Sequence, residues 1–73
     1  MLLATMKEGE TARLLGFFAP EKSRDFYISR GMSPGSRVRV LRRYSDTLVV
    51  RFDSVVFAIG IEIAMSLRVV TGE

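Results

Sequence analysis

Arginine is the residue type in this sequence that offers the most binding chemistry. It supplies nine of the eleven basic side chains. A guanidinium group binds carboxylates and phosphates through paired hydrogen bonds, and it also stacks on aromatic rings. The arginines concentrate in one part of the chain, at Arg37, Arg39, Arg42, Arg43 and Arg51. Such a cluster forms either a solvated outer face or a surface that binds a partner.

The residue types of common catalytic and metal sites are missing. The sequence has no histidine and no cysteine, which removes the usual general bases, nucleophiles and zinc ligands, and disulfides as well. The eight carboxylates are scattered, and none forms a spaced pair suited to acid–base catalysis. We therefore expect no enzyme, no catalytic residue, no cofactor and no tight metal site. Weak transition metal binding by carboxylates is left open.

Length and hydropathy limit which classes of protein this chain can belong to. The chain has 73 residues and a net charge of +3, which favours a single small domain over residues 1–73 with a mildly basic surface. The opening residues lack a signal-peptide pattern. The longest apolar stretch, SVVFAIGIEIAMSL, contains Glu62 and is shorter than the roughly 20 residues of a membrane span. We expect a cytoplasmic protein without membrane insertion.

Five short segments have the pattern or composition of strands, namely residues 10–18, 36–44, 47–52, 54–61 and 66–70. A helix is expected over 20–30, with Pro20 at its first position, and a single helical turn over 61–65. The segment 54–61 is apolar enough to be covered on much of both faces. This order predicts an all-β fold: a small five-stranded barrel that closes the sheet, with one short helix between strands 1 and 2 and a helical turn before the last strand.

The first expected strand contains a break at Gly16, which indicates a bend or a bulge. Ala12 and Leu14 are expected to point inward, and we group Phe18 with them. Because Phe17 and Phe18 are adjacent, one of them must point away from the core. We expect the helix over 20–30 to cover that ring.

The segments 36–44 and 47–52 are expected to form a hairpin, because matching their apolar faces fixes the register. The predicted pairs are Val38–Phe52, Arg39–Arg51, Val40–Val50, Leu41–Val49 and Arg42–Leu48. Val38, Val40, Val50 and Phe52 then line the core. This register implies a loop with an odd number of residues, such as 44–46.

The same register predicts a candidate partner-binding patch. Leu41 and Val49 are expected side by side on the outer face, flanked by Arg39, Arg43 and Arg51. An apolar centre with an arginine rim is typical of a small protein-binding surface. Binding of nucleic acid is the alternative, although no aromatic residue stands among these arginines to stack on bases. We expect no stable nucleic-acid complex.

The stretch ISRGMSPGSRVRV predicts a rigid corner between the helix and the second strand. Gly31 is expected as the left-handed residue after the helix, with Met32 as the apolar contact of the cap. Pro34 and Gly35 predict a turn that prevents the helix from resuming. Because such a corner is preset and expected to be exposed, Met32 and Pro34 are further candidate contacts.

The order of these signals resembles the FeoA family, a small cytoplasmic component of ferrous iron transport. The resemblance rests on Arg24, on Tyr27-Ile28, on the run Gly31-Met32-Ser33-Pro34-Gly35 and on the alternating Val38 and Val40. The opening MKEGETARLLGF and the closing VVFAIGIEIAMSLRVV are similar to the family's ends. Two features depart from the family pattern: the short loop RRYSDT and Gly60, where a basic residue is frequent.

The resemblance implies an SH3-like barrel that acts without catalysis by docking on FeoB, the membrane iron transporter. The sequence leaves two alternatives: a basic nucleic-acid-binding barrel, and a regulatory SH3-like domain related to metal-dependent repressors. The oligomeric state is left open, a homo-oligomer included. Whether the chain activates or inhibits transport is also left open.

Overall fold

Alternating apolar side chains build five strands: β1 (Thr11–Phe17), β2 (Arg37–Arg43), β3 (Thr47–Phe52), β4 (Val55–Gly60) and β5 (Leu67–Thr71). In this computed structural model, which describes residues 1–18 and 21–71 without the side chains of 21–23, the strands form one antiparallel sheet. Its order is β4-β3-β2-β1-β5.

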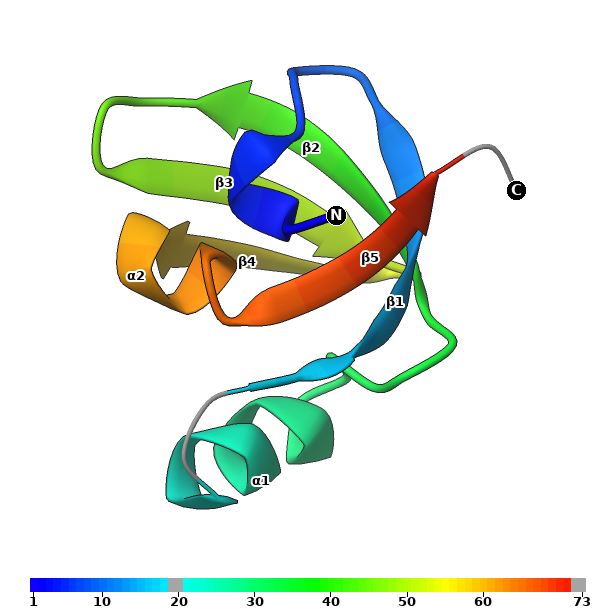
Figure 1. The fold of residues 1–73 in the computed structure, drawn as a ribbon. Coiled ribbons are helices and arrows are strands. Elements are labelled where there is room, and N and C mark those ends of the chain that lie inside the picture. The colour runs from blue at the N-terminus through cyan, green and yellow to red at the C-terminus, as the bar shows by residue number, and fades with distance from the viewer. Residues whose placement is uncertain (19–20, 72–73) are drawn as a thin grey trace.

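Three short helical elements complete the fold. They are the 3₁₀ turn η1 (Leu3–Thr5), the helix α1 (Glu21–Ser29) between β1 and β2, and the turn α2 (Ile61–Ala64) before β5. Figure 1 shows the sheet curled around a central space, with α1 at one end and η1, drawn in dark blue, beside β5. The predicted five strands, one helix and one helical turn are confirmed; Pro20 lies outside the described residues.

The core lies inside the curled sheet. The four side chains expected to line it, Val38, Val40, Val50 and Phe52, are all fully buried. Leu67 and Val69 on β5 are buried with them. Because burying one such side chain contributes about 1.5–3 kcal/mol, these inward faces carry much of the stability of a chain without disulfides.

The barrel is not closed by strand pairing, which differs from our expectation. β4 and β5 are the two ends of the sheet, and in the described residues they pair only with β3 and β1 respectively. The four-residue turn α2 separates them and buries Ala64 completely. Apolar side chains, rather than backbone hydrogen bonds, therefore fill the gap between β4 and β5.

The residues before β1 contribute to this closure, although the sequence indicated no element there. Leu3 and Met6 are fully buried, and Leu2 forms a bridge with Arg68 of β5. The amide of Val69 donates to the carbonyl oxygen of Met1 at 2.8 Å. The segment 1–6 therefore lies across the end of the barrel as an addition to β5.

The expectation that the fourth strand is covered on both faces is wrong. Val55 and Val56 are 38% and 54% exposed, whereas Ile59 is buried. Val56 lies opposite the exposed Arg51 on the outer face of the sheet, and Val55 is the first residue of β4, at the end of the inward row that Ile59 belongs to.

In β1, the predicted irregularity at Gly16 is confirmed, since the pairing with β5 shifts between Leu14 and Gly16. Ala12 and Leu14 are buried as expected. The shift moves Phe17 toward the core and leaves Phe18 64% exposed, so grouping Phe18 with the inward residues was wrong. The helix meets Phe17 through Tyr27, at 6.5 Å between ring centroids, and the exposed ring of Phe18 faces Arg68 instead.

The corner between α1 and β2 has the predicted form. Gly31 has φ = 110°, and its N–H donates to the carbonyl of Ile28 at 3.1 Å. The N–H of Met32 donates to the carbonyl of Tyr27 at 3.0 Å, which completes a Schellman cap. A turn follows, in which the N–H of Ser36 donates to the carbonyl of Ser33 at 3.0 Å. These bonds fix where β2 begins.

Candidate functional site

The candidate site lies on the outer face of the β2–β3 hairpin. Residues 44–46, the segment expected as the loop, connect β2 and β3, and the N–H of Tyr44 donates to the carbonyl of Thr47 at 2.8 Å. The observed pairs Val38–Phe52, Arg39–Arg51 and Val40–Val50 match the expected register. The outward side chains of this half of the hairpin are therefore arginines.

The register changes after Val40, and here the prediction was wrong. Leu41 is an extra residue in a β-bulge, so Arg42 lies opposite Val49 and Arg43 lies opposite Leu48. The expected pairs Leu41–Val49 and Arg42–Leu48 do not form. A bulge places two residues against one and turns the following side chains to the other face, so Arg42 and Arg43 exchange the positions expected of them.

Leu41 and Val49 nevertheless come together. Both are half-buried, and both line one shallow hollow on the surface. We call it the Leu41 hollow; its lining residues are Glu8, Gly9, Arg39, Val40, Leu41, Arg42 and Val49. Its rim has two guanidinium groups, from Arg39 and Arg42, and one carboxylate, from Glu8.

The turn before β1 forms one wall of the Leu41 hollow. The N–H of Gly9 donates to the carbonyl of Val40 at 2.8 Å, which attaches the turn to β2 beside the bulge. A carboxylate oxygen of Glu8 accepts from the N–H of Arg43 at 2.8 Å. This wall is therefore tied to the strand that carries Leu41.

Arg43 does not belong to the rim of the Leu41 hollow. One nitrogen of its guanidinium, Nη1, donates to the carbonyl of Met6 at 2.9 Å. Its strand partner, Leu48, is fully buried. Arg43 therefore attaches the segment 1–6 to β2, a structural contact that the sequence did not indicate.

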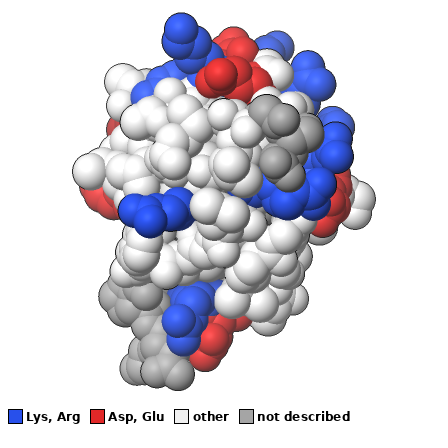
Figure 2. Space-filling model, turned by 45° about the vertical axis from the view of Figure 1, so that its right-hand side comes forward, with Lys and Arg blue, Asp and Glu red and all other residues white. Residues whose placement is uncertain are grey.

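A second hollow adjoins the first and shares Arg39 with it. We call it the arginine hollow; its lining residues are Thr11, Arg37, Arg39, Arg51 and Asp53. Thr11, Arg39 and Arg51 stand in one row across β1, β2 and β3. Arg51, expected beside Leu41, is thus found here. Figure 2 shows Lys and Arg side chains gathered toward the right-hand side, while the middle of that view is largely uncharged.

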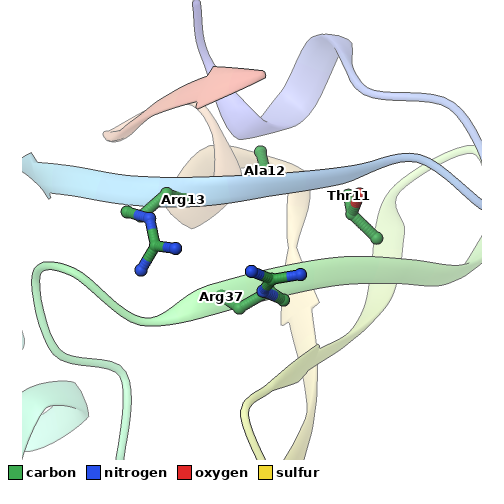
Figure 3. Close-up of a pocket in the computed structure, with 4 residues that line it drawn as sticks. All are labelled: Thr11, Ala12, Arg13 and Arg37. Atoms are coloured by element: carbon green, nitrogen blue, oxygen red, sulfur yellow. The ribbon is translucent and has the colours of Figure 1, made fainter. Parts of the chain in front are cut away.

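Next to this hollow, Arg13 on β1 lies directly opposite Arg37 on β2 (Figure 3). The Nη1 atom of Arg13 donates to the carbonyl of Gly35 at 2.8 Å, so this side chain helps to hold the corner. The space between Thr11, Arg13 and Arg37 is ≈ 10 Å³, about the size of one water molecule. It is too small to hold a ligand by itself.

The two corner residues proposed as contacts differ in accessibility. Pro34 is exposed, but Met32 is fully buried as the apolar contact of the helix cap. Met32 therefore supports the corner and does not reach a partner directly. Pro34 remains a candidate contact.

The described residues contain no group of three or more acidic side chains that could hold a metal ion. No helix among them is long and apolar enough to cross a membrane. What the outer face does offer is an apolar depression beside guanidinium groups, an arrangement suited to binding.

In the two hollows, sequence reasoning found Arg39, Leu41, Val49 and Arg51 but did not place Arg42, Glu8, Thr11 and Asp53 there. Arg42 was assigned to the wrong face because the bulge was not recognised, although the run Val40-Leu41 breaks the alternation and was the available signal. Glu8 and Thr11 reach the site only through the antiparallel pairing of β1 with β2. No local pattern indicates that pairing.

Solved structures with the same fold include an iron uptake regulatory protein (FeoA), with TM-score 0.86 and 24% identity over 96% of this chain and 95% of that one. FeoA of Stenotrophomonas maltophilia, described as a prokaryotic SH3 domain protein, has TM-score 0.81 and 19% identity, covering 94% and 88%. A manganese-dependent transcriptional repressor has TM-score 0.86 and 27% identity; 97% of this chain matches 41% of the repressor. No curated protein matches this chain.

The five-stranded SH3-like barrel predicted from the sequence is thus the fold of FeoA structures. The family model for the FeoA domain matches residues 1–71. FeoA domains are non-catalytic accessories associated with the Feo system of ferrous iron transport. On the strength of that match, this chain belongs to the FeoA family.

Proposed function

We propose that this chain is a cytoplasmic accessory protein that docks on a FeoB-type membrane iron transporter through the Leu41 hollow. The observation that carries the proposal is the juxtaposition of Leu41 and Val49 in one depression beside Arg39 and Arg42. An apolar centre excludes water from an interface, and a charged rim orients the partner and speeds association. A partner that fits this surface presents an apolar side chain flanked by carboxylates.

The position of Leu41 supports this use. A bulged residue has no direct strand partner, so its side chain is directed by the bend of the strand. The anchoring of the neighbouring turn, through Gly9 to Val40, keeps one wall of the hollow in place. A preformed surface of this kind needs little ordering when a partner binds, which favours affinity.

A direct test is a pull-down with the immobilised cytosolic part of a FeoB-type transporter. We expect the wild type to be retained and Leu41→Glu to lose about tenfold or more in affinity, because a carboxylate in the apolar centre removes the apolar contact, competes for Arg39 and Arg42, and repels the carboxylates of the partner. The matched control is Leu15→Glu. Leu15 is 53% exposed on β1 and lines neither hollow, so this variant should bind like the wild type.

The outcomes separate the surface from the partner. Equal retention of the wild type and Leu41→Glu rejects the Leu41 hollow as the docking surface. Failure of the wild type to bind, with correct folding shown by circular dichroism, rejects the transporter as the partner. Loss of binding by both leucine variants indicates general damage from the added charge and also counts against the proposed surface.

Nucleic-acid binding is the second candidate, motivated by the row of arginines on β2 and β3. The docking proposal is favoured because the Leu41 hollow has an apolar centre, and none of the described residues lining either hollow is aromatic. Stacking on aromatic rings supplies much of the affinity for single strands. A titration with oligonucleotides at low salt tests this candidate, whose signature is affinity that falls steeply as salt rises.

A further inference from the structure

Three arginines in the arginine hollow have guanidinium groups that no contact within the described part of the chain uses. Among the described residues, Arg37, Arg39 and Arg51 make no side-chain hydrogen bond or ion pair. Other arginines do make such contacts: Arg43 donates to Met6, Arg42 to Leu41 and Arg13 to Gly35, while Arg30 and Arg68 lie over aromatic rings. The donors of the arginine hollow are therefore available to a ligand.

The sheet brings these three side chains close together. Arg39 and Arg51 are directly opposite each other across β2 and β3, where Cβ atoms are about 5 Å apart. Arg37 and Arg39 are two residues apart on β2, on the same face and about 6.6 Å apart along the strand. Like charges this close repel one another, and this repulsion raises the free energy of the unliganded fold.

The net charge of the hollow is positive. Three guanidinium groups and the carboxylate of Asp53 give +2 for its lining residues. The Oδ1 atom of Asp53 already accepts from the backbone N–H of Arg37 at 3.3 Å. Thr11 adds a neutral hydroxyl donor to the same hollow. This set offers several donors, directed from three strands, to one anion.

We propose that the arginine hollow binds a compact phosphate-bearing anion, of the size of a diphosphate group. The hollow has a volume of ≈ 400 Å³, which lies within the range of about 300–1,000 Å³ typical of small-ligand sites. Guanidinium groups bind phosphate oxygens through paired, charge-assisted hydrogen bonds. The shared chemistry is the diphosphate, whether it is inorganic or carried by a nucleotide.

A compact anion fits better than an extended nucleic-acid strand. Carboxylates limit the positive surface at both ends, with Asp53 in the arginine hollow and Glu8 in the Leu41 hollow. A strand of phosphodiesters running along β2 would pass both carboxylates, which repel it. A compact anion held by Thr11 and the three arginines lies near Asp53 but not near Glu8, so it is repelled less than an extended strand.

The test is a titration of the full chain with inorganic pyrophosphate at low ionic strength, followed by nuclear magnetic resonance of the arginine side-chain N–H groups. We expect saturable shifts confined to Arg37, Arg39 and Arg51. Arg51→Gln should weaken binding about tenfold, because one charge-assisted contact is lost. Arg24→Gln, which removes the same charge from an exposed site on α1, should leave the affinity unchanged. Equal weakening by both variants overturns the proposal in favour of general charge attraction.

Further arms identify the ligand and protect against misfolding. ADP that binds as tightly as pyrophosphate shows recognition of the phosphates alone, and ADP that binds more tightly makes a nucleotide the ligand; both support the site. An oligonucleotide that binds while pyrophosphate does not overturns it. If Arg51→Gln fails to fold, Arg37→Gln replaces it. Binding to the folded state alone also raises the midpoint of thermal unfolding, and no rise at saturating pyrophosphate contradicts the proposal.

The proposal is independent of the docking function. Arg51 and Arg37 line the arginine hollow but not the Leu41 hollow. Loss of pyrophosphate binding by Arg51→Gln with normal retention on the transporter therefore separates the two sites.

Discussion

Arg42 lies directly opposite Val49 across β2 and β3, and Arg43 lies opposite the fully buried Leu48. Two adjacent residues of the same type therefore have different surroundings. The guanidinium of Arg43 donates to the carbonyl of Met6 in a partly buried contact, whereas Arg42 lines the Leu41 hollow. The difference follows from the single extra residue at Leu41.

This relationship predicts different effects for two similar variants: one should lose stability and the other should lose binding. Arg43→Gln should lower the free energy of unfolding by about 1 kcal/mol, because it removes a hydrogen bond that holds the segment 1–6. Arg42→Gln should change stability by less than about 0.5 kcal/mol, as expected of an exposed residue, and should weaken retention on the transporter. Urea denaturation and the pull-down measure the two effects. The same loss of stability in both variants would contradict the bulged register.

The core is small, so one large truncation should have a severe effect. Phe52 is fully buried and meets the ring of Phe57 edge-on at 5.8 Å between centroids. Phe52→Ala should cost about 3–5 kcal/mol, a large fraction of the stability of a domain of this size. Val56→Ala on the exposed face of β4 is the control and should cost less than about 0.5 kcal/mol. Thermal unfolding of both variants tests the assignment of inner and outer faces.

The corner at Gly31 predicts a strict requirement for glycine. A Cβ atom there would lie 3.1 Å from Cγ2 of Val55, in a backbone conformation with φ = 110° that other residues rarely adopt. Gly31→Ala should therefore lower the free energy of unfolding by about 1–3 kcal/mol. Gly16→Ala is the matched control, because nothing lies within 4 Å of its added Cβ. A stability for Gly31→Ala equal to that of Gly16→Ala would show that the corner is not constrained as described.

Asp53 offers a test of the arginine hollow that adds no bulk. Its φ is 54°, a left-handed conformation that asparagine also tolerates. Asp53→Asn should keep the fold and raise the net charge of the hollow, so we expect pyrophosphate to bind about threefold more tightly. Calorimetric titration at low salt measures this change. Weaker binding in Asp53→Asn would show that the carboxylate itself orients the ligand or a donor.

The parts of the fold that sequence reasoning recovered depend on local signals. The helix end at Gly31, the turn at Pro34-Gly35 and the inward faces of Val38, Val40, Val50 and Phe52 follow from conformational preference and two-residue periodicity. The segment 44–46 was correctly expected between the two strands, although the register used to argue for it changes at Leu41.

The parts that were missed depend on contacts between distant segments. The role of Leu3 and Met6 in closing the barrel, and of Glu8 beside Arg43, requires the segment before β1 to reach β5 and β2. Exposure of Val55 and Val56 depends on how β4 pairs with β3, which places Val56 on the outer face beside Arg51 and Val55 at the end of the strand. The apolar centre of the candidate site and Arg39 on its rim were identified, but Arg42 was not, because the bulge at Leu41 reversed the faces of the residues after it.

The segment 1–6 and β5 hold each other in place, as shown by the hydrogen bond from the Val69 amide to Met1 and the bridge between Leu2 and Arg68. We therefore expect the segment 1–6 and β5 to separate from the barrel in one local unfolding step. Local fraying of β5 alone would expose Leu3, Met6 and Ala64 to water at the same time. The amide of Val69 should thus exchange its hydrogen with solvent as slowly as those of the central strands.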